Sequence, residues 1–173
     1  MTRLNKQGLT RRALLSRAMA AGALAVAGPG FIAAPDAAWA VEVTAISEHD
    51  MATLLQMARD IYPHDRVGDR FYAVAIKSYD TPEQKQMVAE GIAALDAAAK
   101  QAGFDTYLAA GWEDERVAIL RSIQDTPFFQ TVRGGLVTGL YNQKDVWPIF
   151  GYEGESFSQG GYIARGFDDI DWL

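Results

Sequence analysis

Hydrophobic residues recur every three or four positions along most of the chain after residue 47, which is the spacing of one face of an α-helix. Met51, Leu54, Leu55 and Ala58, for example, fall on one side of the first such stretch. No stretch shows the strict alternation that is typical of a strand. The pattern predicts five helices, which run over 48–62, 69–79, 82–102, 113–123 and 127–141. We therefore expect residues 41–143 to form one small all-α domain.

Short polar motifs mark where these helices begin and end. Ser47, with Asp50 three residues later, is typical of a capping box, in which each side chain bonds the other residue's backbone N–H. Thr81-Pro82 and Thr126-Pro127 each combine a capping hydroxyl with a proline in the first turn. Pro63 has no N–H to donate and ends the first helix.

Three glycines, Gly134, Gly135 and Gly139, interrupt the last predicted helix. Each costs about 1 kcal/mol relative to alanine in a helix interior, so their presence needs a reason. One explanation is close packing against another helix of the same chain. The other is a flat strip that the backbone of another protein approaches.

Residues 144–173 form an irregular tail that is rich in glycine and aromatic residues and has neither helical nor strand periodicity. Disordered segments are poor in aromatic residues, so this tail is expected to bury them somewhere. It either wraps its own domain or docks on a partner. Trp, Tyr and Arg dominate the energetics of protein interfaces. The candidate anchors of that kind are Trp147, Tyr152, Tyr162, Arg165 and Trp172.

Residues 1–40 have the order of an export signal. The pair Arg11 and Arg12 precedes an apolar run over 18–34, and Ala38-Trp39-Ala40 is a small-x-small cleavage site. Paired arginines favour the twin-arginine route, which carries folded proteins, often with a cofactor bound, so we expect a periplasmic protein. The alternatives are an ordinary secretory signal with an incidental arginine pair and a membrane anchor. The glycines and proline at 28–30 disfavour the anchor.

Charge and cysteine content narrow the classes of partner and chemistry. The chain has a formal charge of −6, and it becomes more acidic without residues 1–40, which hold five cations and one anion. Such a surface repels nucleic acid and anionic lipid, so neither is an expected partner. The chain has no cysteine, which excludes covalent haem attachment, thiolate ligation of an iron–sulfur cluster and a nucleophilic thiol.

We predict no catalytic, cofactor-binding or metal-binding residue in the sequence. His64 and Asp65 could contribute to a metal site, but a histidine after a helix stop is more often on the surface, and we expect His49 to be solvated. The acidic cluster near the C-terminus lacks the alternating spacing of a calcium loop. That cluster comprises Asp168, Asp169 and Asp171.

Several motifs carry a resemblance to a known family. Residues 58–63 read Ala-Arg-Asp-Ile-Tyr-Pro, and the tail holds Gly-Tyr-Glu-Gly at 151–154, Gly-Gly-Tyr at 160–162 and Arg-Gly-Phe-Asp-Asp-Ile-Asp-Trp at 165–172. In these motifs the chain resembles the small subunit of bacterial membrane-associated FAD-dependent dehydrogenases, of the gluconate 2-dehydrogenase subunit 3 type. The motifs add Glu153 and Phe167 to the predicted partner-binding residues.

The resemblance implies a three-part assembly. A large flavoprotein of the glucose–methanol–choline oxidoreductase type holds FAD and oxidises an alcohol, sugar or sugar acid, and a multihaem cytochrome c takes the electrons. The small subunit holds no cofactor and helps the flavoprotein to fold and to cross the membrane through the twin-arginine translocase. The chain is therefore expected to be a non-catalytic subunit and export escort. The alternative is a stand-alone periplasmic helical enzyme or metal-binding domain that uses His64.

Overall fold

The computed structural model of the protein describes residues 25–28, 31–33 and 41–163. The predictions for Arg11, Arg12, Arg165, Phe167 and Trp172 lie outside the described residues.

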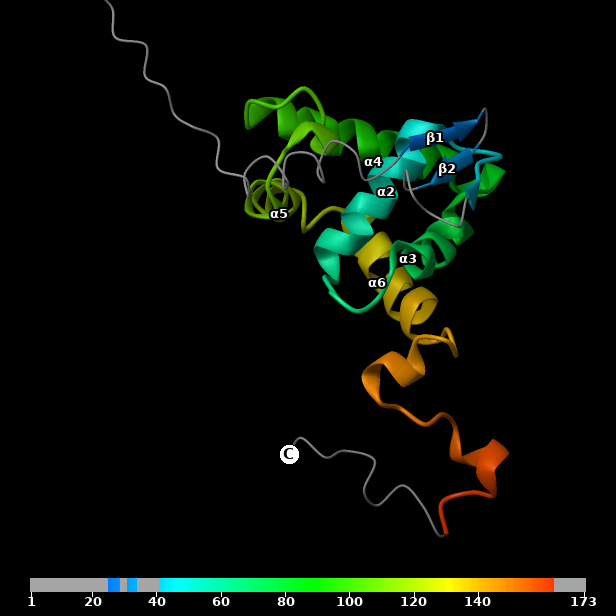
Figure 1. Cartoon of the computed structure of the whole chain (residues 1–173). Helices are drawn as coiled ribbons and strands as arrows, with labels where there is room; N and C mark the ends of the chain where they lie inside the picture. The colour runs from blue at the N-terminus through cyan, green and yellow to red at the C-terminus, as the bar shows by residue number, and fades with distance from the viewer. Residues whose placement is uncertain (1–24, 29–30, 34–40, 164–173) are drawn as a thin grey trace, which may run out of the picture.

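Five α-helices make up the domain in the described part of the chain, which confirms the predicted all-α class (Figure 1). Their bounds are α2 Glu48–Ile61, α3 Asp69–Ile76, α4 Pro82–Gln101, α5 Glu113–Ser122 and α6 Pro127–Tyr141. Short 3₁₀ helices follow α3, precede α5 and occupy the tail. They are η1 Lys77–Tyr79, η2 Tyr107–Ala109, η3 Trp147–Phe150 and η4 Ser156–Gln159.

The helix starts follow from local hydrogen bonds that the sequence motifs predicted. The Asp50 N–H donates to Ser47 Oγ at 3.1 Å, and the Ser47 N–H donates back to the Asp50 carboxylate at 3.2 Å. The hydroxyls of Thr81 and Thr126 accept from backbone N–H groups three residues on. These bonds satisfy donors that would otherwise have no partner within the helix.

Helix α2 lies at the centre of the domain, where it contacts α3, α4, α5 and α6. Its predicted apolar stripe is buried, and the stripes of the other helices close over it. Tyr72 and Tyr107 are fully buried, and their hydroxyls are satisfied by the Tyr62 carbonyl and the Asp60 carboxylate. Burying apolar side chains together supplies most of the folding free energy of such a domain. Among the described residues, no helix is both long and apolar enough to cross a membrane.

Three short strands, which the sequence pattern did not predict, form a small antiparallel sheet before α2. They are β1 Ala25–Gly28, β2 Phe31–Ala33 and β3 Val41–Glu42, paired in that order. Ile32 pairs with Val26 on one side and with Val41 on the other. Strands of two to four residues are too short to show an alternating pattern, which explains why they were missed.

Candidate functional site

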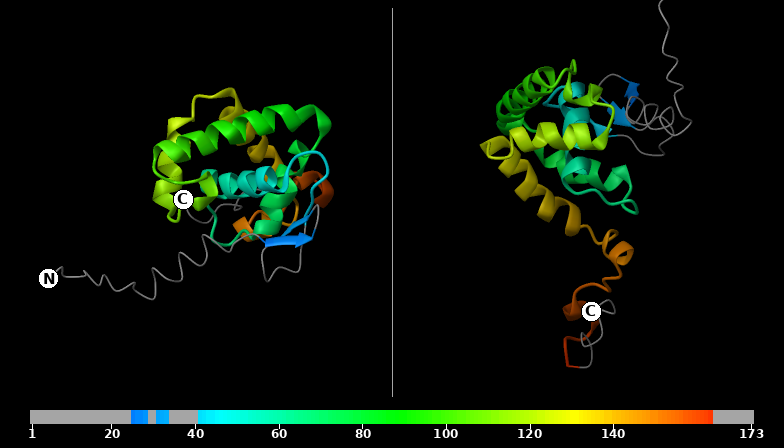
Figure 2. Two further views of the ribbon diagram at one scale, coloured as in Figure 1. Left: turned by 90° about the horizontal axis from the view of Figure 1, so that it is seen from above. Right: turned by 90° about the vertical axis from the view of Figure 1, so that its left-hand side faces the viewer.

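Residues 144–163, which we call the arm, extend from the end of α6 away from the helical domain (Figures 1 and 2). The arm consists of η3 and η4 with irregular chain around them. Gly151 and Gly160 end the two 3₁₀ helices with φ of 79° and 91°, a left-handed conformation that glycine adopts without strain. Of the two alternatives for the tail, the first part packs on its own domain, with Val146 fully buried, whereas residues 151–163 extend away from the helices.

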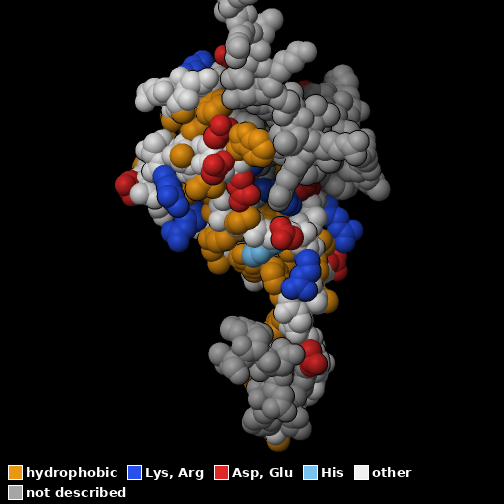
Figure 3. Space-filling model, turned by 60° about the vertical axis from the view of Figure 1, so that its left-hand side comes forward, with side chains coloured by type: hydrophobic (Ala, Val, Ile, Leu, Met, Phe, Trp, Pro, Cys, Tyr) orange, Lys and Arg blue, Asp and Glu red, His pale blue; other side chains and the backbone are white. Residues whose placement is uncertain are grey.

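Several large apolar side chains of the arm are exposed to solvent. Phe157 is 93% exposed, Ile163 is 95% exposed and Tyr162 is 70% exposed. Phe150 and Tyr152 are nearly half exposed. In Figure 3 the arm leaves the domain through a narrow neck, away from the helices. Exposed apolar groups in such number are typical of a surface that contacts another molecule.

Trp147 fixes the start of the arm to α6. Its indole N–H donates to the Tyr141 carbonyl at 2.7 Å, and its ring meets the Tyr152 ring edge-on at 5.2 Å. The Lys144 ammonium lies 5.6 Å from the Trp147 ring centroid. Trp147 is thus half-buried at the base of the arm, and it has an internal role in addition to the partner contact predicted for it.

A cluster of rings joins the arm to the end of α2. His64 Nε2 and the Tyr141 hydroxyl form a hydrogen bond of 2.6 Å, and the His64 and Phe150 ring centroids are 5.0 Å apart. Tyr62 packs edge-on against Tyr141. Burial, followed by the charge of Arg59, lowers the pKa of His64, which favours its neutral form. His64 therefore lies half-buried at the junction between domain and arm.

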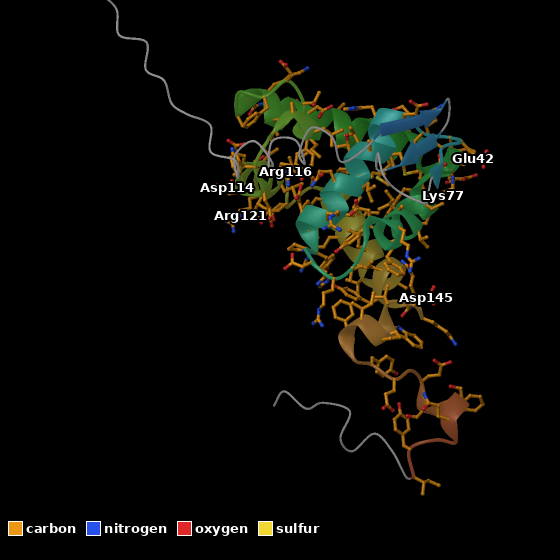
Figure 4. All side chains as sticks on the ribbon, viewed as in Figure 1. Glu42, Lys77, Asp114, Arg116, Arg121 and Asp145 are labelled. Carbon is orange, nitrogen blue, oxygen red and sulfur yellow. The ribbon has the colours of Figure 1, made fainter. Side chains whose placement is uncertain are left out.

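Two carboxylates hold the interior together, and neither role was predicted. Asp60 accepts from the Tyr107 hydroxyl at 2.5 Å and from the Arg116 guanidinium at 2.7 and 3.0 Å (Arg116 is labelled in Figure 4). Burial, reinforced by the negative charge of Asp60, raises the pKa of Tyr107. The phenol therefore stays protonated and donates.

Asp80 holds the chain that leads into α2. It accepts from the backbone N–H groups of Thr44, Ala45 and Ile46 at 2.7–3.0 Å and from the Lys77 ammonium at 2.7 Å. Lys77 also donates to the Glu42 carbonyl, and the two residues lie together in Figure 4. Burial alone would raise the pKa of Asp80, but the hydrogen bonds outweigh it and hold that pKa well below its usual range.

The glycines of α6 have two different environments. A Cβ on Gly135 would lie 2.0 Å from the Tyr79 hydroxyl, and one on Gly139 would lie 3.0 Å from the Ala75 carbonyl oxygen. A Cβ on Gly134 would meet nothing within 4 Å. Close packing within the chain therefore explains Gly135 and Gly139, but it does not explain Gly134.

The histidine near the start of α2 does not fit its prediction fully. His49 is exposed, as expected for a solvated side chain, but its Nε2 lies 2.8 Å from the Asp96 carboxylate. Asp96 is 47 residues away in the sequence, so the spacing could not reveal the pair. Within the described ranges, no group of three or more His, Asp or Glu side chains could hold a metal ion.

Four of the predicted partner-binding residues lie in the arm as described. Trp147 and Tyr152 come together at its base, whereas Tyr162 lies at the other end of the described segment. Glu153 is exposed between them, and its carbonyl accepts from the Gln159 amide. Comparison of the chain with protein-family models, with curated proteins and with solved structures gave no match in any of the three.

Proposed function

We propose that this chain is a non-catalytic small subunit and export escort of a periplasmic FAD-dependent dehydrogenase of the gluconate type. The observation that carries the proposal is the arm, which presents Phe157, Tyr162 and Ile163 to solvent beyond a folded domain. The resemblance of the tail motifs to the small subunits of such dehydrogenases supports the choice of partner. The substrate, an alcohol, sugar or sugar acid, would bind in the large subunit.

The arm suits a docking role because its base is fixed and its outer part is uncovered. The Trp147 hydrogen bond and the His64 ring cluster hold its start against α6. A segment with a fixed start loses less conformational entropy on binding than a free tail. Exposed aromatic side chains then supply contact area to a partner, and anchors of this kind contribute about 2 kcal/mol or more each.

The division of roles in the proposed complex follows from the same residues. FAD belongs to the large subunit, and a cytochrome c would accept its electrons. This chain contributes the docking surface and, through Arg11 and Arg12, the twin-arginine signal that takes the folded pair across the membrane. In this proposal the flavoprotein leaves the cytoplasm bound to the small subunit.

The test is isolation of the tagged full-length chain from periplasm and membranes of its own source, followed by a visible absorption spectrum. The proposal predicts a second band of flavoprotein size and the absorption of oxidised flavin. Substrates can then be screened on the complex. If the tagged chain is isolated alone and without flavin absorption at every salt concentration tested, this result would contradict the proposal.

A further inference from the structure

A hollow of about 490 Å³ lies between α4 and the segment that leads into α6. Its floor is apolar and includes Met87, Ile123, Pro127 and Phe128. Gly91 shapes this floor, since a Cβ there would lie 2.2 Å from the Phe128 ring. Phe128 can lie against α4 only because residue 91 has no side chain. We call this hollow the α4 groove.

The rim of the α4 groove is acidic. Glu83 and Glu90 both line it, and no lysine or arginine is among its lining residues. The two residues are seven positions apart on α4, so they lie on the same side of the helix, about 10 Å apart along its axis. Gln86, between them, donates to the Glu90 carboxylate at 2.9 Å. The groove therefore fits a segment that combines apolar side chains with positive charge.

The chain itself contains such a segment in residues 1–24. These residues hold no acidic side chain, and Leu14 and Leu15 directly follow the arginine pair. Their cations are Arg3, Lys6, Arg11, Arg12 and Arg17. We propose that the α4 groove binds the chain's own N-terminal segment, with leucine side chains over Phe128 and arginines at Glu83 and Glu90. This contact would form whichever protein binds the arm.

The covalent connection allows this contact within one molecule. The described part of the chain begins at Ala25, the first residue of β1. Strand β2, which pairs with β1, contacts α2, and α2 in turn contacts α4. Twenty-four extended residues span up to about 80 Å, whereas a domain of this size is only a few tens of Å across. Tethering also raises the local concentration of the segment, so a weak contact suffices. When the groove is occupied, the arginine pair is covered.

Cysteine cross-linking tests the contact in the full-length chain, which has no cysteine of its own. One variant combines Ser16→Cys with Ala94→Cys, an exposed position that lines the groove. The matched control combines Ser16→Cys with Ala89→Cys, which is exposed on the same helix but does not line the groove. Under mild oxidation we expect the groove pair to form an intramolecular disulfide about tenfold faster than the control pair. Equal rates would overturn the proposal, and so would disulfide-linked dimers, which would show that a second copy fills the groove.

A second measurement needs no cysteine. Trypsin cleavage after Arg11 and Arg12 is expected to be about fivefold faster in Glu83→Gln/Glu90→Lys than in the unaltered chain, because the segment loses its charged partners. The control is Glu113→Gln/Asp114→Lys, a matched change at the exposed start of α5, outside the groove lining. Cleavage at the same rate in all three proteins would contradict the proposal.

Discussion

Replacing Asp80 by asparagine should destabilise the domain by about 3 kcal/mol at pH 7. The carboxylate has no exposed surface and accepts five hydrogen bonds, from three backbone N–H groups, the Thr44 hydroxyl and Lys77. An asparagine keeps one acceptor oxygen but turns an NH₂ group toward donors. Two backbone N–H groups then lose an anionic acceptor, at about 1.5 kcal/mol each. The chain that leads into α2 would detach from the body of the domain.

The difference in stability between the unaltered chain and Asp80→Asn should depend on pH. The pKa of Asp80 lies below its ordinary value of 3.8 in the folded protein, so near that pH the unfolded chain binds more protons than the folded one. The stability that the carboxylate contributes is complete above pH 3.8 and is lost as the pH falls below it. The gap between the unaltered chain and Asp80→Asn should therefore shrink in acid.

Urea unfolding of both proteins, followed by circular dichroism between pH 7 and pH 2.5, measures this gap. Asp50→Asn serves as the matched control because its carboxylate is only half-buried and accepts a local bond from the Ser47 N–H. A gap of less than about 0.5 kcal/mol at pH 7 would refute the reasoning, because surface substitutions alone reach that size. A gap that stayed constant in acid would refute the assigned charge of Asp80.

Three further predictions concern α6, the signal and the arm. Gly135→Ala should destabilise the domain by about 1–3 kcal/mol, because the Tyr79 hydroxyl must move from its place. Gly134→Ala, whose new methyl group meets open space, should instead stabilise the domain by about 0.5–1 kcal/mol. Equal effects of the two substitutions on thermal unfolding would contradict the packing assigned to α6. Arg11→Lys with Arg12→Lys should leave this chain in the cytoplasm, since lysine lacks the planar fork of arginine; normal export on cell fractionation would show the pair to be incidental. Trp147→Phe should speed amide exchange in the arm and change global stability by no more than about 1 kcal/mol, because only the bond to the Tyr141 carbonyl is lost; unchanged exchange would argue against its anchoring role.

The helices could be predicted from the sequence because the information that starts them is local. Ser47, Thr81 and Thr126 each accept a hydrogen bond from a backbone N–H only three residues ahead. The cap and the first helical turn are therefore contained in one short sequence motif. The apolar stripe of α2 likewise follows from spacing alone. The strands, in contrast, are too short for a pattern, and their pairing depends on residues in other strands.

The polar interior could not be predicted, because its partners are far apart in the sequence. Asp80 bonds backbone groups 34 to 36 residues earlier, and Asp60 bonds Arg116 across 56 residues. Each acid looks like an ordinary surface carboxylate in the sequence. The glycines of α6 are a similar case, since two explanations fitted the pattern and only the position of Tyr79 distinguished them for Gly135.

The composition of the sequence indicated where the candidate site lies, but it did not indicate which residues of the site contact one another. Aromatic and glycine content marked residues 144–173 as unusual, and the described arm is indeed irregular with exposed rings. No motif indicates that Trp147 bonds the Tyr141 carbonyl or that His64 lies against Phe150. The His64–Phe150 contact joins residues 86 positions apart, and the Trp147 bond depends on how the chain turns after α6. The docking role of the arm remains a prediction.

The central claim is that the arm binds the flavoprotein, and the most direct measurement is the amount of flavoprotein retained by arm variants of the tagged full-length chain. Phe157→Ser with Tyr162→Ser removes two exposed rings, and Val74→Ser, an exposed apolar position on α3, is the matched control. Our account predicts that the double variant retains less than about a tenth of the flavoprotein, with the same melting temperature as the unaltered chain, while the control retains all of it. Full retention by the double variant would contradict the claim.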